Sequence, residues 1–313
     1  MGAPRASVLM SVRNNERYVR SACESVLSQT VEDFELVVLD NGSTDRSAAI
    51  IADLAAEDKR VRLVSREERS LIQSRNELLE MARSPIVAWM DSDDLARPRR
   101  LETQLAMLDA SPDLVCVGGA AVVVDPDGDR IDFEVYPEDH ETIVDLQMQG
   151  VGGMRFPCVT MRREVALKLG GFRQPFHMCE DFDLLMRMSE VGRMANTSRI
   201  VLEYREHLRN TSRMLRHRWP VYRDFVLKLA HQRAKSGSDV LAEGKKVQLE
   251  FPDKPPVADI AWETRDEWAR RALQVGHKKT AWKHMMLAVA SRPLRVGSWK
   301  LFARVLIGES KRP

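Results

Sequence analysis

The chain has 313 residues, of which 44% are hydrophobic and 30% charged, as in a globular protein with one large domain and room for an appendage. The formal net charge of +2 gives no reason to expect nucleic acid as a partner. The longest apolar stretch, residues 114–124, contains two glycines and is too short to span a bilayer.

Four cysteines (Cys23, Cys116, Cys158 and Cys179) lack the spacing of a disulfide framework or a zinc site, and we expect reduced thiols. The N-terminus has no secretory pattern, because a short polar lead runs directly into a strand-like segment. These features predict a cytoplasmic protein.

The first 94 residues alternate between short apolar runs and amphipathic helical patterns. The runs at 7–12, 35–40, 61–65 and 86–90 predict strands, and helices are expected between them and after Pro98. Near-continuous apolar strands separated by helices predict an α/β fold with a mainly parallel central sheet flanked by helices. Ligands of such sheets bind beyond the carboxyl ends of the strands.

An acidic cluster follows the fourth predicted strand, where Asp91, Asp93 and Asp94 stand almost side by side. Three adjacent carboxylates repel one another unless a cation or a proton lies among them. Oxygen ligands suit Mg²⁺ or Mn²⁺, and either ion could neutralise a departing diphosphate. The alternative interpretation is a solvated turn with N-capping aspartates ahead of Pro98.

Two further acidic segments have both a functional and a structural interpretation. Asp40 ends the second strand and could accept a hydrogen bond from a base or ribose, or belong to an ordinary strand-to-helix turn capped by Ser43 and Thr44. Glu180 and Asp181 open an amphipathic helix, where the helix dipole stabilises carboxylates. In the functional interpretation of this second segment, a carboxylate acts as the general base that takes the proton of an acceptor hydroxyl.

The second half alternates less regularly. We expect a hairpin of residues 114–124 and 130–135 across the turn 125–129, a strand at 158–162, helices at 163–169 and 181–191, and a last strand at 200–204. From about residue 214 the pattern is helical, interrupted by prolines at 250–258, and residues 262–275 and 280–290 predict a helical hairpin.

Several short motifs occur together in a specific order: residues 7–15, 25–30, 40–45 (Asp-Asn-Gly-Ser-Thr-Asp), the Arg75-Asn76 pair, 91–94 (Asp-Ser-Asp-Asp), and the Glu180-Asp181 pair. In this order they resemble the family-two glycosyltransferases of the GT-A fold, over about residues 7–212. The resemblance implies a GT-A domain at 1–213, with a nucleotide-sugar-binding half at 1–94 and an acceptor half at 95–213. Residues 214–313 would be a helical C-terminal region.

The resemblance also implies residue roles. The donor-binding residues would be Ser11, Arg13, Asp40, Asn41, Arg75, Asp91, Ser92, Asp93 and Asp94. The divalent ion, Mn²⁺ or Mg²⁺, would bind Asp91 and Asp93, and His207 would be a further metal ligand or a diphosphate contact. Asp181 would be the catalytic base and Glu180 its neighbour, in an inverting transfer from a nucleotide-sugar, most simply a UDP-sugar.

Four positions depart from the family pattern. Arg13 replaces a tyrosine, Asn41 replaces a second aspartate, Phe156 stands where many relatives carry histidine, and the glycine usual before the Arg75-Asn76 pair is missing. Because an asparagine can still accept a hydrogen bond, a UDP donor is expected, while donor sugar, acceptor and linkage stay open.

Two alternative functions fit a similar sheet. A sugar nucleotidyltransferase needs a glycine-rich phosphate loop after the first strand, and residues 13–16 do not form one. The remaining alternative is an inactive GT-A-fold protein that binds nucleotide-sugar or glycan.

The acceptor would be a glycan, glycolipid or other hydroxyl compound of polysaccharide or glycoconjugate biosynthesis. The amphipathic stretch 299–306 could contact the inner face of a membrane, pair with a second copy, or pack on its own domain.

Overall fold

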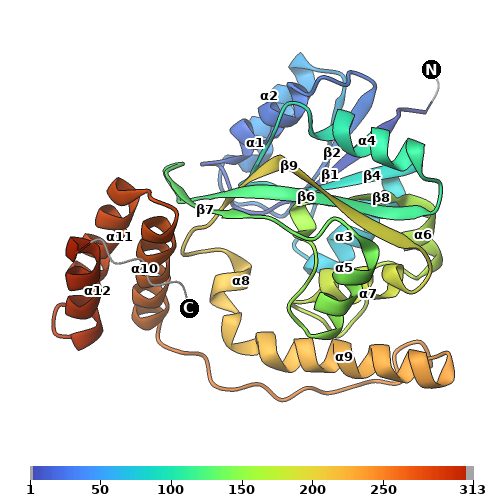
Figure 1. The fold of residues 1–313 in the computed structure, drawn as a ribbon. Coiled ribbons are helices and arrows are strands. Elements are labelled where there is room, and N and C mark those ends of the chain that lie inside the picture. The colour runs from blue at the N-terminus through green and yellow to red at the C-terminus, as the bar shows by residue number, and fades with distance from the viewer. Residues whose placement is uncertain (1–2, 308–313) are drawn as a thin grey trace. The chain divides into compact units, whose positions relative to one another are not determined.

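The computed structural model describes residues 3–307, excepting the side chains of Ser298, Leu301, Arg304 and Ile307 (Figure 1). Nine strands of these residues form one sheet in the order β3-β2-β1-β4-β8-β6-β9-β5, with β7 paired to β6. The strands are β1 (Ala6–Val12), β2 (Phe34–Asn41), β3 (Val61–Arg66), β4 (Ile86–Asp91), β5 (Leu95–Ala96), β6 (Leu114–Val124), β7 (Arg130–Glu134), β8 (Thr160–Arg162) and β9 (Arg193–Arg205).

Helices alternate with the first strands and dominate the C-terminal third. They are α1 (Val19–Leu27), α2 (Ser47–Glu57), α3 (Leu71–Met81), α4 (Arg100–Ala110), α5 (His140–Met148), α6 (Arg163–Lys168), α7 (Glu180–Ser189), α8 (Thr211–Met214), α9 (Trp219–Ser236), α10 (Val257–Gln274), α11 (Lys278–Ser291) and α12 (Val296–Ile307). Short 3₁₀ turns occur at Phe156–Cys158 and Arg216–Arg218.

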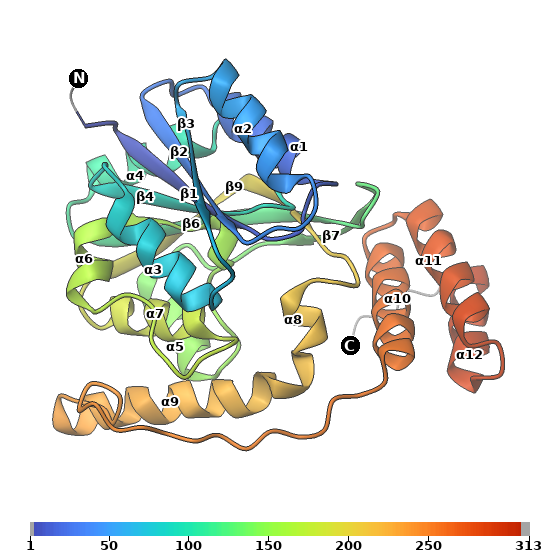
Figure 2. The same ribbon diagram turned by 180° about the vertical axis from the view of Figure 1, so that it is seen from behind.

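The strands β3, β2, β1 and β4 form the parallel part of the sheet. Every residue of β2 is buried, as its continuous apolar run predicted. Helices α1 and α2 cover one face and α3 covers the other (Figures 1 and 2). The predicted α/β class, with parallel strands flanked by helices in the first half, is therefore confirmed.

The rest of the sheet is largely antiparallel. Strand β8 pairs antiparallel with both β4 and β6, and β5 pairs antiparallel with β9. The predicted hairpin across residues 125–129 is present as β6 and β7. Strand β9 begins well before the predicted start at residue 200, because the amide of buried Asn196 donates to the carbonyls of Pro137 (2.7 Å) and Gly153 (2.9 Å). Because a polar residue is buried there, the hydrophobic pattern of the sequence did not indicate the first part of this strand.

Helix α5 was not predicted from the sequence. It is short, and it buries only Ile143 and Gln147. Its signal is the N-cap, where the side chain of Asp139 accepts a hydrogen bond from the N–H of Thr142 at 2.8 Å.

The chain divides into two compact units. The first comprises residues 1–121, 135–203 and 220–249, and the second comprises 122–134, 204–219 and 250–313. Helix α9 belongs to the first unit, and the turn between β6 and β7 belongs to the second.

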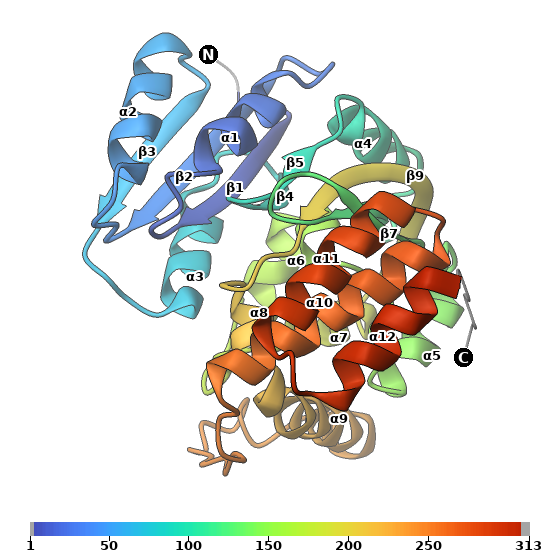
Figure 3. The same ribbon diagram turned by 90° about the vertical axis from the view of Figure 1, so that its left-hand side faces the viewer.

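Within the second unit, α10, α11 and α12 pack side by side around an apolar cluster that includes Trp262, Ala269, Met285 and Val305 (Figure 3). The predicted helical hairpin is thus confirmed as α10 and α11. No helix within residues 3–307 combines the length and the hydropathy needed to cross a bilayer.

Ionic contacts, buried around Glu206 and partly exposed around Lys283, tie these helices to other segments of the same unit. Glu206 accepts hydrogen bonds from Arg271 (2.8 Å) and Trp268 (2.5 Å) of α10, and also from Arg213 of α8. Lys283 of α11 donates to the three aspartates of the β6–β7 turn, at 2.6 Å to Asp125 and 2.7 Å to each of the others. Because charged groups avoid burial unless they are paired, these contacts specify where α10 and α11 sit on the turn and on residues 204–213.

Candidate active site

The strand register brings two predicted site segments to one edge of the sheet. Val12 of β1 lies opposite Asp40 of β2, and Ser11 lies opposite Asp91 of β4. Because these three strands are parallel neighbours, their carboxyl ends and the loops that follow them share one rim.

Side-chain hydrogen bonds join the loops after β1 and β2. The N–H of Asn14 donates to Ser43 Oγ at 2.9 Å, and the N–H of Thr44 donates to Asn14 Oδ1 at 2.7 Å. Asn15 then connects this pair of loops to the acidic cluster, because its Nδ2 donates to Ser92 Oγ at 2.7 Å. Ser92 is therefore held in place by the first loop.

The segment 66–70, which continues from the end of β3, forms a wall beside this rim. The side-chain amide of Asn41 donates to the carbonyl of Arg69 (2.9 Å) and accepts from its N–H (3.0 Å). Gly42 has φ +71, and a Cβ there would lie 2.7 Å from the backbone nitrogen of Glu68, so only glycine fits. Arg13 forms an exposed ion pair with Glu68. Two of the residues that depart from the family pattern, Arg13 and Asn41, thus contact this wall.

The acidic cluster is compact, since oxygen atoms of Asp91, Asp93 and Asp94 lie within 4.8 Å of one another. Asp94 is fully buried, whereas the other two are partly exposed. Partial removal from water raises the pKa of Asp91 to about 6, with further repulsion from Asp93 and Asp181 and opposition from Arg75. The cluster has the ligand chemistry of a site for a hard divalent cation.

Arg75 of α3 lies between two carboxylates. Its Nη1 donates to Glu180 Oε1 at 2.5 Å, and its Nη2 is 3.8 Å from Asp91 Oδ1. The guanidinium carbon of Arg75 lies over two aromatic rings, 4.7 Å from the ring centroid of Phe156 and 5.5 Å from that of Phe172. Burial raises the pKa of Glu180 to about 7, against the attraction of Arg75 and with repulsion from Asp181.

Glu180 and Asp181 form the first turn of α7, as predicted from the sequence. The N-cap residue Cys179 has φ +66, a left-handed conformation that is uncommon for residues other than glycine. Glu180 is buried against Arg75, whereas Asp181 is partly exposed and close enough to Asp91 to affect its pKa. The two neighbouring carboxylates therefore differ in environment.

Sequence reasoning missed Arg100 and Arg155, two cations near the acidic cluster. Arg100 of α4 is buried, donates to the carbonyl of Trp89 at 2.7 Å, and interacts electrostatically with Asp94 and Asp91. Arg155 lowers the pKa of Asp91. The only local signal was a run of arginines after Pro98, which equally fits a solvated helix start.

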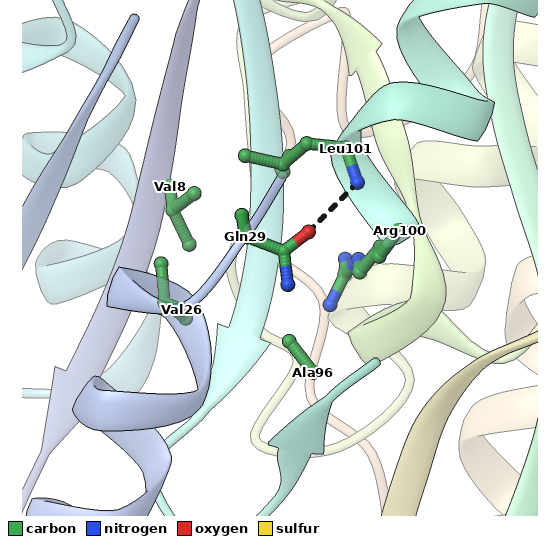
Figure 4. Close-up of a pocket in the computed structure, with 7 residues that line it drawn as sticks. Val8, Val26, Gln29, Ala96, Arg100 and Leu101 are labelled. Atoms are coloured by element: carbon green, nitrogen blue, oxygen red, sulfur yellow. Dashed lines mark hydrogen bonds between the residues drawn. The ribbon is translucent and has the colours of Figure 1, made fainter. Parts of the chain in front are cut away.

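A small internal void of about 10 Å³ lies beside Arg100, lined also by Val8, Val26, Gln29, Ala88, Ala96 and Leu101 (Figure 4). Gln29 closes it by accepting a hydrogen bond from the N–H of Leu101 at 2.9 Å. This space has room for about one water molecule and belongs to the core.

His207 belongs to the second compact unit. Its N–H donates to Asn210 Oδ1, and the N–H of Arg209 donates to its ring Nδ1 at 3.1 Å. In a neutral ring the proton then resides on Nε2. The structure thus brings Ser11, Asp40, Arg75, Asp91, Ser92, Asp93, Asp94, Glu180 and Asp181 into one unit, and the role of His207 stays a prediction.

Comparison with known sequences agrees with this arrangement. Residues 7–170, more than half of the chain, match the family model for glycosyl transferase family 2. The O-antigen biosynthesis glycosyltransferase WbnJ of Escherichia coli is 31% identical over 211 residues, which cover 66% of this chain and 82% of that protein. EpsH of Bacillus subtilis is 33% identical over 135 residues, and the chain covers only 39% of its length.

Solved structures show the same fold. The mannosyltransferase PcManGT of Pyrobaculum calidifontis, solved with GDP-Man and Mn²⁺, has a TM-score of 0.54 at 18% identity, covering 97% of this chain and 80% of that one. S. aureus TarS 1–349, solved with UDP-GlcNAc, has a TM-score of 0.55 at 16% identity, covering 97% and 89%. The predicted GT-A fold is therefore confirmed.

Proposed function

We propose a specific reaction for this chain, which belongs to glycosyl transferase family 2: it transfers a sugar from a UDP-sugar to an acceptor hydroxyl, inverting the anomeric centre. The observation that carries the proposal is the grouping of Arg75, Asp93 and Asp181 around Asp91, which ends the parallel strand β4. That place suits a nucleotide diphosphate.

The uracil assignment rests on Asp40. This residue is 4% exposed, and its buried Oδ1 has no hydrogen-bond partner among residues 3–307. A buried acceptor of this kind needs a donor, which the single imide N–H of uracil supplies. Asn41 has both ends of its amide engaged by Arg69, so we assign it to holding the pocket wall.

The acidic cluster fits a divalent cation. Three carboxylates lie within reach of one ion, and repulsion from Asp93 and Asp181 adds to burial in raising the pKa of Asp91. Asp91 and Asp93 would hold Mn²⁺ or Mg²⁺, the former being present with GDP-Man in PcManGT. When bound, the ion would stabilise negative charge on the departing diphosphate.

Asp181 is the residue we assign as the base. Glu180 is occupied by Arg75, which leaves the more exposed Asp181 to meet an acceptor. Asp181 takes the proton of the acceptor hydroxyl, the hydroxyl oxygen bonds to the anomeric carbon, and the bond from that carbon to the diphosphate oxygen breaks. One displacement with one base inverts the configuration.

The acceptor would be a glycan or glycolipid of polysaccharide or glycoconjugate biosynthesis, as the name of the relative WbnJ suggests. We place the reaction in the cytoplasm or at the inner face of the membrane, where a lipid-linked acceptor would lie.

The first test measures thermal stabilisation by UDP, GDP, dTDP and CMP, with and without Mn²⁺, because a ligand of the folded state raises the melting temperature. We expect UDP to stabilise the chain, more strongly with the metal, and Asp93→Ala to lose the metal-dependent part. Asp53→Ala, an exposed change on α2, is the matched control. Stabilisation by none of the nucleotides would contradict the proposal. UDP binding without turnover on any acceptor would favour an inactive nucleotide-sugar-binding protein.

A further inference from the structure

The last two helices lie in a strongly basic part of the chain. From Lys278 to Gly308 the sequence contains no aspartate or glutamate, whereas lysine and arginine occur at 278, 279, 283, 292, 295, 300 and 304. The whole chain is nearly balanced, with 48 basic and 46 acidic residues. The excess positive charge is therefore local to α11, α12 and the residues that join them.

Part of this charge is neutralised within the second unit. Lys283 is bound to the aspartates of the β6–β7 turn, and Arg292 and Arg295 pair with Asp259 at 3.0 Å and 3.3 Å. Lys279 and Lys300 are exposed and have no acidic partner among the described residues. These two lysines thus keep their charge available to a partner.

The outer side of α12 is apolar and exposed. Val296, Trp299 and Leu306 are 68%, 54% and 62% exposed, and Ala303 between them is exposed as well. Their spacing of three, four and three residues places them on one side of a helix. Leu294, directly before the helix, is 97% exposed.

Helix α11 extends this surface. Trp282 and Met286, one turn apart, are 37% and 53% exposed. The ring of Phe302 lies 6.0 Å from that of Trp282 and 5.9 Å from that of Trp299, and so joins the two helices. We call this surface the α11–α12 face, formed by Trp282, Met286, Leu294, Val296, Trp299 and Leu306. The opposite side of each helix is already buried in the apolar cluster of the unit.

We propose that the α11–α12 face docks on the surface of an anionic lipid bilayer. A second copy could cover the apolar side chains, but it would bring two basic segments together, and like charges repel. An anionic bilayer offers both an apolar layer and opposite charge, and tryptophan side chains favour its interface. Because none of the described helices can span a bilayer, the contact is interfacial.

Vesicle sedimentation tests this contact without donor, acceptor or metal, so its outcome is independent of the sugar-transfer proposal. We expect the chain to bind phosphatidylcholine vesicles that contain about 30 mol% phosphatidylglycerol, and to bind pure phosphatidylcholine at least about tenfold more weakly. Raising the salt to about 1 M should weaken the binding.

Two double variants separate the contributions of apolar contact and charge. Leu294→Ser with Leu306→Ser, and Lys279→Glu with Lys300→Glu, should each reduce binding at least about tenfold. All four positions are exposed, so the fold should persist, which unchanged thermal unfolding would verify. The matched controls, Val135→Ser with Val191→Ser and Lys59→Glu with Lys235→Glu, change exposed residues of the first unit and should bind as wild type.

Equal binding to neutral and anionic vesicles, or binding that survives both double variants, would overturn the proposal. So would a stable dimer in light scattering that Leu294→Ser with Leu306→Ser converts to monomer, because the face would then belong to a second copy.

Discussion

Nη1 of Arg75 lies 2.5 Å from Oε1 of Glu180, although the two residues are 105 positions apart in the chain. The pair is buried, and Arg75 also approaches Asp91 at 3.8 Å. One guanidinium therefore links the start of α7 to the end of β4. Glu180 is committed to this contact, and its neighbour Asp181 is therefore the carboxylate that we propose as the base.

Asp181→Asn should lower kcat by about 10²–10⁴-fold, because the amide cannot take the proton of the acceptor hydroxyl. Stabilisation by UDP and metal should be nearly unchanged, since we assign the donor contacts to other residues. A transfer assay beside thermal unfolding with UDP would check both expectations. Asp53→Asn serves as the control, and wild-type turnover by Asp181→Asn would remove this residue from the mechanism.

The free energy of unfolding of Glu180→Gln, compared with that of wild type, should increase as the pH rises. Burial raises the pKa of Glu180 from its ordinary 4.5 to about 7, so the folded chain holds this proton more tightly than the unfolded chain. Wild type therefore loses stability between about pH 4.5 and 7, as the carboxyl ionises inside the fold. Urea unfolding at about pH 5 and pH 8 would measure the difference.

Glu57→Gln, an exposed change on α2, is the control for that experiment and should show no such trend. If Glu180→Gln and wild type change in parallel across this pH range, Glu180 does not titrate in the way its burial requires.

Gly42→Ala should weaken UDP binding and destabilise the fold by about 2 kcal/mol or more. Its left-handed backbone disfavours a side chain, and the new Cβ would lie 2.7 Å from the backbone nitrogen of Glu68. Gly152→Ala is the matched control, since its φ is +82 but nothing lies within 4 Å of the added atom. Unfolding midpoints that fall equally for both variants would show that the close approach to Glu68 has no energetic weight.

Glu206→Gln should destabilise the second unit by about 3 kcal/mol near neutral pH. Arg271 and Arg213 hold the pKa of Glu206 at about 2 despite its burial, against an ordinary 4.5. The stability from this carboxylate is therefore present above about pH 4.5 and is lost as the pH falls toward 2. Hydrogen exchange of α10 and residues 204–213 would report the local loss.

The control for Glu206 is Glu263→Gln on the same helix, an exposed position that should leave the exchange of α10 unchanged. Equal protection in Glu206→Gln and wild type at neutral pH would mean that the buried ionic contacts do not hold these segments together.

Local patterns in the sequence determined the parallel half of the sheet and the place of the acidic cluster. The apolar run of β2 and the helices on either side of it predict a parallel strand, and Asp91, Asp93 and Asp94 directly follow another. Because the carboxyl ends of parallel strands share one edge of a sheet, the strand pattern placed Asp40 and this cluster on the same rim. The motifs that resemble the glycosyltransferase family lie on those same loops.

Only the tertiary structure decided how the charges are paired. The contact of Arg75 with Glu180, the position of Arg100 near Asp94, and the engagement of Asn41 by Arg69 join residues far apart in sequence. The early start of β9 likewise depends on a contact between distant residues, since buried Asn196 donates to the carbonyl of Pro137. Hydrophobic periodicity records which side of an element is buried, but a buried polar group is stabilised by a particular partner, and only the packed chain specifies which one.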